Sequence, residues 1–542
     1  MLELSTLDWL VLAGFALLMV GVVVASMRQK EEDTTDYFLA GRNAGWLVIG
    51  ASIFASNIGS EHLVGLSGSG AESGMALAHW ELQSWIILLL GWIFVPFYWS
   101  SKVYTMPEFL ERRFNPQSRS FLSVISLVSY VLTKVAVTVY AGGVAFKTIL
   151  GIESIWGIDF FWISAVGLVV LTGVYTVLGG MKAIMWTSVI QTPVLIIGSV
   201  VILVVGLEQV GGWAEMERLN GENMHLMRAA SDANFPWPGI VFGSFIIGFW
   251  YWCTDQYIVQ RVLSAKGIQA ARRGTIFAGY LKLLPVFIFL VPGLIAHALQ
   301  AKGIISFDSA DQAFPTLVAE LLPSGVKGIV IGGLLAALMS SLASLFNSSA
   351  TLFTIDFYKK YKPESSEQQL LKVGRIATVV VVVLGILWIP VMSLIADVLY
   401  EYLQSVQSLI APGIAAVFLL GICSKHITPT AGYVGLVAGF ILGMFRLVLL
   451  PFRDAIHGTP IAWVVEMNWL YYCVLLFVLV CLIVIGLSFV TKAPSEDNVR
   501  GLTFSTLGKD TLQDVIKGLD KWDYIHSGII LGITAFIYWR FW

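Results

Sequence analysis

The chain has 542 residues, of which 57% are hydrophobic and only 13% are charged, and its mean hydropathy is +0.80. No class of soluble globular protein combines these values, so the sequence predicts an all-α protein that crosses a lipid bilayer many times. The formal net charge of −2, without a basic cluster interleaved with aromatic residues, gives no reason to expect a nucleic-acid partner. The four cysteines lack metal-ligand spacing, so neither a disulfide framework nor a zinc site is predicted.

The apolar segments predict about 14 transmembrane helices, taking about 20 residues for each crossing. The segments are 6–27, 45–72, 80–99, 119–147, 159–178, 183–207, 237–260, 274–299, 326–354, 375–396, 404–422, 430–450, 467–490 and 523–541. The first is expected to stay in the membrane, because the preceding residues lack the basic region and cleavage site of a signal peptide.

The basic residues predict the orientation in the membrane. If the first span starts outside, the inner loops hold 23 of the 33 Lys and Arg residues, including those of the long polar loop 491–522. The outer loops and outer helix ends hold 8, and the remaining two fall inside spans. The positive-inside rule therefore predicts that both termini lie outside a cell membrane.

The two intramembrane cations are Lys134 and Lys282. Each would cost about 2.5–3.5 kcal/mol if it faced lipid at the bilayer centre, so each is expected to face protein, water or a partner. For Lys282, which lies about two turns from the inner end of its helix, an ammonium that snorkels to the interface is the alternative.

The stretch from Gly50 to Gly70 reads GASIFASNIGSEHLVGLSGSG and loses its hydrophobicity in mid-span. Free backbone groups and polar side chains are tolerated at membrane depth only where they face protein or water. A helix broken near Ser56–Ser60 that lines a site is therefore the favoured interpretation, with Glu61 and His62 adding ionisable groups. The alternative is a helix of small residues packed tightly against its neighbours.

Two further segments depart from an apolar pattern. Residues 248–257, GFWYWCTDQY, indicate either an aromatic belt at the membrane interface or part of a site. In 336–349, Ser341, Ser344 and Ser348 share one helix face with Ser340 adjacent, which indicates either close packing or an ion site. No pair of groups is placed for catalysis, so an enzyme is not predicted.

Several strings together resemble the sodium/glucose cotransporter family, the sugar branch of the solute:sodium symporters. They include DYFLAGRNAGWLVIGASIFASNIGSEHLVGLSGSG, WYWCTDQYIVQRVLSAK, GYLKLLPVF and MSSLASLFNSSATLFTIDFY, and they extend from about residue 36 to 450. The resemblance implies a leading helix in 1–44, five-helix repeats of inverted topology in 45–236 and 237–425, and three additional helices in 426–542. It also implies that each repeat begins with a discontinuous helix, broken at Ala55–Ser60 and near Trp250–Cys253.

The resemblance also implies the site residues. Sodium, the co-transported ion, would bind the carbonyls of Ala55, Ile58 and Ala337 and the hydroxyls of Ser340 and Ser341. These neutral oxygens would replace much of its hydration shell without adding fixed charge. The substrate residues implied are His62, Glu81, Ser84, Lys282 and Gln404, with Tyr251 closing the site from below and held by Asn57. The gate residues implied are Leu66, Trp80, Tyr400 and Trp252, besides Asn57.

Three departures from the family pattern limit what can be carried over. Ser188 follows Thr187 where many members have an aspartate associated with a second sodium ion, which favours one sodium per substrate. Gly248 stands where many have an Asn or Thr that touches the sugar, so the orientation of the substrate is open. The Ser-Glu-His order at 60–62 also occurs in inositol-transporting relatives.

The sequence therefore predicts a sodium-coupled symporter of a hexose that works by alternating access, with no obligate protein partner. Three alternatives remain at this stage. The solute is inositol or another polyol, it is a carboxylate such as an amino acid or sialic acid, or the protein is a sugar sensor or channel that does not concentrate its substrate.

Overall fold

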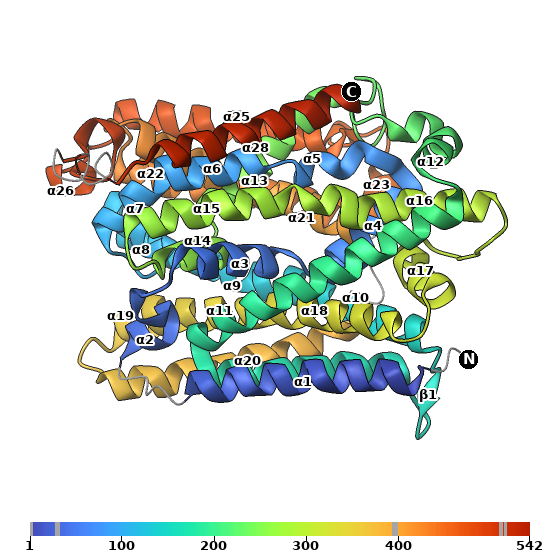
Figure 1. Cartoon of the computed structure of the whole chain (residues 1–542). Helices are drawn as coiled ribbons and strands as arrows, with labels where there is room; N and C mark the ends of the chain where they lie inside the picture. Colours follow the sequence, from blue (N-terminus) through green and yellow to red (C-terminus); the bar gives the residue numbers. More distant parts are fainter. Residues whose placement is uncertain (1–3, 28–32, 393–398, 509–512, 514–517) are drawn as a thin grey trace.

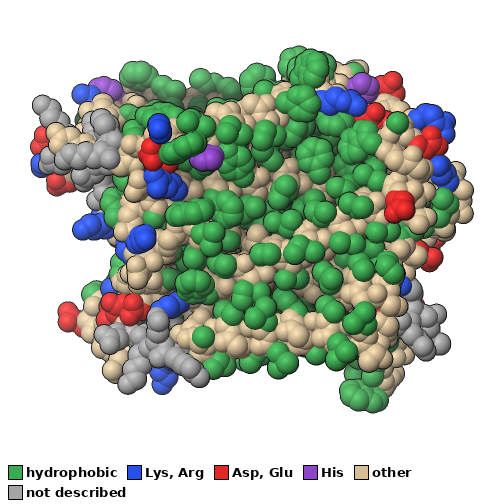
Figure 2. Space-filling view, in the orientation of Figure 1, with side chains coloured by type: hydrophobic (Ala, Val, Ile, Leu, Met, Phe, Trp, Pro, Cys, Tyr) green, Lys and Arg blue, Asp and Glu red, His purple; other side chains and the backbone are tan. Residues whose placement is uncertain are grey.

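The computed structural model describes residues 4–27, 33–392, 399–508, 513 and 518–542. The protein is a bundle of helices that run mostly in one direction and its reverse (Figure 1). Both termini lie at the same end of the bundle, as an even number of crossings requires. Hydrophobic side chains cover the middle of the face seen in Figure 2, whereas Lys, Arg, Asp and Glu gather toward the two ends. This is the surface of a protein that spans a bilayer.

The helices of the first part of the chain are α1 (Thr6–Met27), α2 (Thr34–Leu39), α3 (Trp46–Asn57), α4 (Ser67–Ser73), α5 (Ala78–Glu81), α6 (Ser84–Leu89), α7 (Val95–Ser101), α8 (Met106–Arg113), α9 (Pro116–Ser129), α10 (Ala136–Leu150), α11 (Phe160–Val210) and α12 (Trp213–Asn220). A hairpin of β1 (Ser154–Ile155) and β2 (Ile158–Asp159), with Ser154 opposite Asp159, joins α10 to α11.

The helices of the second part are α13 (Trp237–Phe249), α14 (Gln256–Leu263), α15 (Ile268–Lys282), α16 (Val291–Ala301), α17 (Ala313–Leu321), α18 (Val326–Thr351), α19 (Lys359–Tyr361), α20 (Glu367–Met392), α21 (Leu399–Cys423), α22 (Pro429–Leu449), α23 (Arg453–Ile456), α24 (Trp463–Glu466), α25 (Trp469–Val490), α26 (Glu496–Val499) and α28 (Lys521–Arg540).

Short π-helical turns join many of these helices. They are η2 (Glu61–Leu66), η4 (Leu90–Phe94), η5 (Tyr130–Val135), η7 (Trp250–Thr254), η8 (Val286–Leu290) and η10 (Leu352–Tyr358). The 3-10 turns are η1 (Ala40–Arg42), η3 (Gly74–Leu77), η6 (Gly221–Met224), η9 (Ala310–Gln312), η11 (Leu450–Phe452) and η12 (Phe504–Thr506). Turns of π-helix are rare and occur often at functional sites.

Ten helical runs of the described residues are long and apolar enough to cross a membrane. One of them, α11, has 51 residues, and at about 1.5 Å per residue its helical length is about 76 Å, more than twice the thickness of the hydrocarbon core. It turns at Gly180 (φ 50°, ψ −155°) and packs against α1 as well as α16, so it crosses twice (Figure 1).

The other differences from the predicted fourteen also have a structural reason. Spans 45–72 and 80–99 run together in one helical stretch after the break in the first of them. Segment 237–260 is interrupted, and 523–541 corresponds to the more polar helix α28, so neither is among the ten runs. The count of fourteen stays a prediction.

Both of the first helices of the proposed repeats are interrupted. Helix α3 ends at Asn57, and Ile58 is extended (φ −86°, ψ 113°) before η2 begins, which is the break expected at Ala55–Ser60. In the second helix, Trp250–Cys253 stay helical as part of η7, and the extended residue is Asp255 (φ −77°, ψ 128°). The break therefore lies two residues beyond the predicted segment, because the Asp255 carboxylate caps the N-terminus of α14 by accepting from Tyr257 N.

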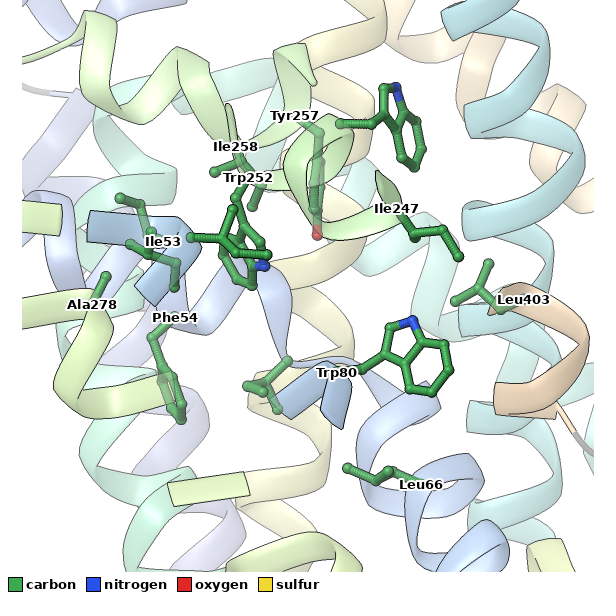
Figure 3. Packing of buried hydrophobic residues seen from close by; sticks show 14 of the residues in the cluster. Ile53, Phe54, Leu66, Trp80, Ile247, Trp252, Tyr257, Ile258, Ala278 and Leu403 are labelled. Carbon is green, nitrogen blue, oxygen red and sulfur yellow. The ribbon is translucent and has the colours of Figure 1, made fainter. Parts of the chain in front are cut away.

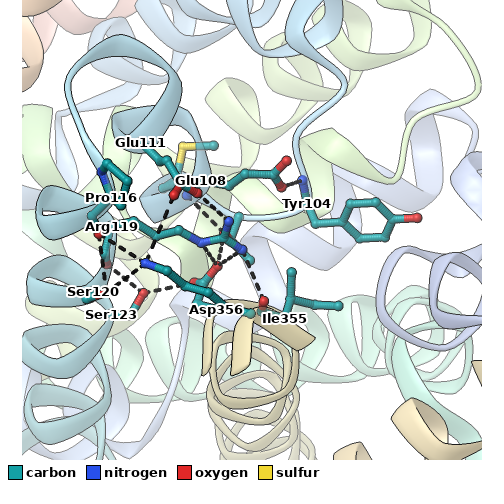
Figure 4. Close-up of polar contacts among 12 residues, drawn as sticks. Tyr104, Glu108, Glu111, Pro116, Arg119, Ser120, Ser123, Ile355 and Asp356 are labelled. Atoms are coloured by element: carbon teal, nitrogen blue, oxygen red, sulfur yellow. Dashed lines mark hydrogen bonds and ion pairs between the residues drawn. The ribbon is translucent and has the colours of Figure 1, made fainter. Parts of the chain in front are cut away.

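A buried polar network away from these breaks ties α8 and α9 to η10 (Figure 4). The Asp356 carboxylate accepts hydrogen bonds from Thr105 Oγ1 and Ser123 Oγ, both at 2.9 Å, and from Arg119 Nε at 2.8 Å. Arg119 also pairs with Glu111 at 2.5 Å. The network joins residues of 45–236 to residues of 237–425 and leaves the charge of Asp356 compensated.

Candidate ion and substrate site

A cavity of about 40 Å³ lies where the two interrupted helices approach each other. Its wall is made by residues from both of the proposed repeats and mixes aromatic, amide and charged side chains. They are Asn57, Glu61, His62, Trp80, Gln83, Lys134, Ile247, Gly248, Tyr251, Trp252, Tyr257, Lys282, Ser341, Leu345, Leu403, Gln404 and Gln407. A concave site with aromatic walls and a few convergent polar groups is typical of a small-molecule site.

Aromatic rings form much of the wall. Figure 3 shows Ile247 and Leu403 close to the indole of Trp80, with the indole of Trp252 further to the left. Trp80 stacks on Trp469 with ring centroids 5.7 Å apart, and Trp252 meets Tyr251 edge to face at 4.9 Å. These contacts hold the rings in place, so their faces can pack against the C–H surface of a ligand.

A buried charge pair lies beside the cavity. Lys282 Nζ is 2.5 Å from Glu81 Oε2, and His62 Nε2 is 3.5 Å from Glu81 Oε1. Lys282 is only 3% exposed, so its ammonium does not snorkel, and the expectation that it faces a partner in the protein is confirmed. The pair compensates its own charge, which leaves the cavity without an unopposed cation at this point.

The predicted substrate residues fall into two groups. His62, Tyr251, Lys282 and Gln404 line the cavity. Glu81 and Ser84 are fully buried and are not part of the lining: Glu81 lies behind Lys282 and His62 as their acceptor.

The predicted gate residues are also divided. Asn57, Trp80 and Trp252 line the cavity, and Leu66 is buried at the end of η2. The side chain of Tyr400 lies outside the described part of the structure. Asn57 Nδ2 is 3.4 Å from His62 Nε2 in this state of the protein, and its contact with Tyr251 stays a prediction.

Several buried polar atoms around the cavity lack a hydrogen-bond partner among the residues that the structure describes. They are Trp80 Nε1, Ser84 Oγ and Gln404 Oε1. A buried polar atom without a partner costs about 1–3 kcal/mol, so native proteins rarely keep one without a functional reason. Trp80 and Gln404 line the cavity, whereas Ser84 lies behind its wall, and the donor and acceptor in the wall suit a ligand whose groups both donate and accept.

Of the predicted sodium residues, Ser341 contacts the first break directly. Ser341 Oγ on α18 donates to Ser56 O at 2.9 Å, and Ser340 Oγ is 3.5 Å from Ser188 Oγ. Ala55, Ile58 and Ala337 are buried on the same two elements. Within the described ranges no group of three or more His, Cys, Asp or Glu side chains could hold a metal ion. A cation at this break would therefore depend on hydroxyl and carbonyl oxygens.

The serines that share one face of α18 make different kinds of contact. Ser344 Oγ pairs with Ser56 Oγ at 2.8 Å, and Ser348 Oγ donates to Gln260 Oε1 at 2.9 Å. These two serines join helices, as the packing interpretation expects. One turn earlier, Ser341 contacts the backbone carbonyl of Ser56 at the break, where the ion interpretation places the cation, whereas Ser340 contacts Ser188 of α11.

The second break holds another buried ion pair. Lys134 Nζ is 2.9 Å from Asp255 Oδ2, and the hydroxyl of Tyr130 donates to Asp255 Oδ1. The ammonium lies 4.3 Å from the ring centroid of Tyr251 and 4.4 Å from that of Tyr257. The aromatic residues of 248–257 thus surround an internal cation and line the cavity, so they are not an interfacial belt. The expectation that Lys134 faces a partner is confirmed.

The sequence did not single out six residues of the lining, which are Gln83, Ile247, Tyr257, Leu345, Leu403 and Gln407. Gln407 lies one helical turn after Gln404, and this spacing could have revealed it. Gln83 carried no local signal. Tyr257 ends the segment 248–257, which the sequence singled out only as a whole; its hydroxyl donates to Ser56 O and lies 3.2 Å from Ser341 Oγ. Tyr257 therefore touches the predicted ion site and the cavity at once.

The sequence model of the sodium:solute symporter family matches residues 37–439. The chain belongs to this family. It is therefore a multi-pass membrane transporter that couples solute movement to sodium, and it is not an enzyme.

Named relatives of this symporter include two kinds of protein. It is 36% identical over 545 residues to "Sodium/glucose cotransporter 4" of Mus musculus, covering 93% of this chain and 78% of the relative. It is also 36% identical over 550 residues to "Sodium/myo-inositol cotransporter" of Canis lupus familiaris, covering 92% and 76%. The resemblance found in the sequence is confirmed, and these two relatives differ in the solute that their names give.

Two solved structures have a similar fold. A Na⁺-coupled sialic acid symporter in a substrate-bound outward-open state matches with a TM-score of 0.76 at 22% identity, covering 90% of this symporter and 98% of that chain. Mhp1, a nucleobase-cation-symport-1 family transporter in a closed conformation, matches with a TM-score of 0.51 at 16% identity, covering 86% and 98%. The predicted class of fold, a helical transporter core, is confirmed by these neighbours.

Proposed function

We propose that this symporter moves a hexose, or a cyclic polyol of similar size such as inositol, together with one sodium ion by alternating access. The observation that carries the proposal is the cavity between the two interrupted helices, which has aromatic faces, amides and partnerless polar atoms in one wall. Relatives of both solute types, at equal identity, support this class of substrate.

The substrate would be held through its hydroxyl groups. A hydroxyl both donates and accepts, so it can satisfy Gln404 Oε1 and Trp80 Nε1 in the same site. His62 and Lys282 add donors, Glu81 compensates the charge of Lys282, and the ring of Tyr251 stacks on the C–H face. A carboxylate solute is disfavoured, because the lysine that would attract it is already paired.

The sodium ion would bind the carbonyls of Ala55, Ile58 and Ala337 and the hydroxyls of Ser340 and Ser341. The chemistry of these oxygens suits a hard monovalent cation that must also leave again. To coordinate it, the Ser341 hydroxyl would turn its proton away from the cation that its oxygen binds. One ion per substrate is favoured because Ser188 offers a hydroxyl, which donates to Ile184 O, in place of a carboxylate.

Tyr257 supplies a physical connection between ion and substrate. Its hydroxyl contacts Ser56 and Ser341 at the predicted ion site, and its side chain lines the cavity. An ion that orders this region would raise the affinity for the substrate, and linkage requires the substrate to raise the affinity for sodium by the same factor. The sodium gradient, with about 2.3 kcal/mol per charge per 100 mV of membrane potential, would then drive accumulation.

The remaining assignments complete the proposed transport cycle. Leu66, Trp80 and Tyr400 would close the site from outside, and Tyr251, Trp252 and Asn57 from inside. The 45–236 and 237–425 repeats would rock against each other, with both termini outside the cell membrane, as the distribution of basic residues favours.

Uptake into proteoliposomes tests the proposal directly. Labelled galactose, glucose, myo-inositol and proline would be supplied under an inward sodium gradient, with choline replacing sodium in the control. We expect accumulation of one of the three polyols above equilibrium only with sodium. Accumulation of proline alone would contradict the substrate class, and sodium-dependent binding without accumulation would indicate a sensor or channel.

The pocket itself is tested by Gln404→Ala. Removal of the amide should raise the substrate concentration for half-maximal uptake by about fivefold to tenfold, the effect of one lost hydrogen bond. Gln369→Ala, an exposed residue on α20, is the matched control and should behave like the unaltered protein. An unaltered response to substrate in Gln404→Ala would move the pocket elsewhere.

A further inference from the structure

Gln83 lies between α5 and α6 and is held by two hydrogen bonds to the second interrupted helix. Its Nε2 donates to Ser244 O at 2.9 Å on α13, and its Oε1 accepts from Trp252 Nε1 at 3.0 Å in η7. The carbonyl of Ser244 must face the amide nitrogen, and the indole N–H must face the amide oxygen. The two partners therefore set the orientation of the amide, and the Gln83 side chain is only 4% exposed.

The position of this amide depends on Gly248. A β-carbon at residue 248 would lie 2.5 Å from Gln83 Oε1, 2.6 Å from Cδ and 2.8 Å from Nε2. All three distances are shorter than any ordinary contact with a β-carbon, so the amide lies flat on the backbone of α13. Any other residue at 248 would displace it. The Gln83 amide thus occupies the space that a side chain at residue 248 would fill, and it extends there from the other proposed repeat.

The amide is not saturated by its two partners. A primary amide has two N–H donors and two acceptor positions, and Ser244 and Trp252 use one of each. One donor and one acceptor remain on a group whose side chain lines the cavity. A hydroxyl group can complement both at once by accepting from the N–H and donating to the oxygen, and two neighbouring hydroxyls can share them.

We infer that Gln83 contacts the substrate and determines the substrate specificity of the symporter. Its amide would form hydrogen bonds with a hydroxyl on the side of the polyol that faces Gly248. The inference rests on the proposed function and adds to it a residue pair, Gln83 and Gly248, that acts as one unit. It requires a substrate with a hydroxyl at that position. A monodeoxy analogue that lacks this hydroxyl leaves the buried amide without its third partner and loses affinity.

The test compares the transported polyol with its complete set of monodeoxy analogues in proteoliposomes. In the unaltered protein, one analogue should show an uptake constant about tenfold higher than the parent polyol through loss of contact with Gln83. In Gln83→Leu, which keeps the size of the side chain, that analogue and the parent should be taken up equally well. Gly248→Ala should produce the same loss of discrimination with Gln83 still present.

Gln404→Ala is the matched control, because it removes another amide of the same cavity. It should alter discrimination at a different hydroxyl and leave that of Gln83 intact. A merely structural role for Gln83 predicts instead that Gln83→Leu weakens uptake of the parent and every analogue by one common factor, and that result would overturn the inference. If the unaltered protein accumulates no polyol, the proposed function fails and the inference fails with it. If polyol uptake is normal and both Gln83→Leu and Gly248→Ala still discriminate against the same analogue, the inference is overturned and the proposed function stands.

Discussion

The two interrupted helices around the cavity keep their backbones open by different means. At Ile58 hydroxyls of Ser341 and Tyr257 approach the carbonyl of Ser56, the Arg261 guanidinium donates to Ser56 Oγ at 3.1 Å, and none of these contacting groups is a carboxylate. At Asp255 the break carries a carboxylate that is bound to Lys134 at 2.9 Å. The first break therefore leaves hydroxyl and carbonyl oxygens that can coordinate a transported sodium ion, whereas the second contains the buried ammonium of Lys134.

The comparison explains why one ion site is expected and not two. A carboxylate that already accepts from an ammonium and a tyrosine hydroxyl has little attraction left for sodium, and removal of either charge would leave the other buried. Neutral oxygens bind an ion more weakly and can release it, which transport requires. The second break is thus suited to structure and gating, and the first to binding.

The largest effect is expected at the second break. Lys134→Met should leave Asp255 buried without its cation and lower the free energy of unfolding by about 3–5 kcal/mol. Thermal unfolding of the purified protein in detergent measures this change. The double variant Lys134→Met with Asp255→Asn should recover part of the loss, because no unpaired charge remains.

Lys147→Met is the matched control for that prediction. It removes a lysine that is paired with Asp159 at 2.8 Å on the surface, where both side chains are partly exposed. Surface ion pairs contribute little, so its melting temperature should be unchanged. Equal stability of Lys134→Met and Lys147→Met would show that the two breaks do not differ in the way proposed.

The next largest effect is expected at the first break. In Ser341→Ala, sodium-stimulated uptake should fall to background at ordinary sodium concentrations, because loss of one ligand raises the half-maximal sodium concentration by about tenfold or more. Folding should be intact, since the serine hydroxyl is small and its acceptor Ser56 O keeps the bond from Tyr257. Uptake measured across a sodium series checks this.

Ser349→Ala is the corresponding control on the same helix, because the buried Ser349 hydroxyl has no hydrogen-bond partner among the described residues. Its sodium dependence should match that of the unaltered protein. An unchanged sodium dependence in Ser341→Ala would remove this serine from the ion site.

The smallest effect is expected for the hydroxyl that connects the two breaks. Tyr257→Phe should reduce the factor by which sodium raises substrate affinity by about fivefold, which corresponds to roughly 1 kcal/mol of coupling. Substrate binding with and without saturating sodium gives this factor. Tyr175→Phe, which loses a buried hydrogen bond to Met339 O on α18, is the control and should leave the factor unchanged. A full coupling factor in Tyr257→Phe would mean that ion and substrate communicate by another route.

The first break could be predicted from the sequence because its cause is local. Polar and glycine residues within an apolar span cannot face lipid, and the run from Ser56 to Ser60 is long enough to show this. The second break was predicted only as near Trp250–Cys253, and it lies two residues further on at Asp255, because the N-cap role of Asp255 becomes visible only once the start of α14 is known. Lys134 and Lys282 were expected to have partners, but the partners could not be named.

The sequence by itself determined the membrane class, the family and the first break. Hydropathy and short polar interruptions are local properties, so they can be read without coordinates. Only the tertiary structure decided that Lys134 meets Asp255 across 121 positions of sequence, that Lys282 meets Glu81, and that Gln83 fills the space above Gly248. Such pairings depend on how helices from the two repeats pack, and nothing in the neighbourhood of either residue along the chain specifies the other.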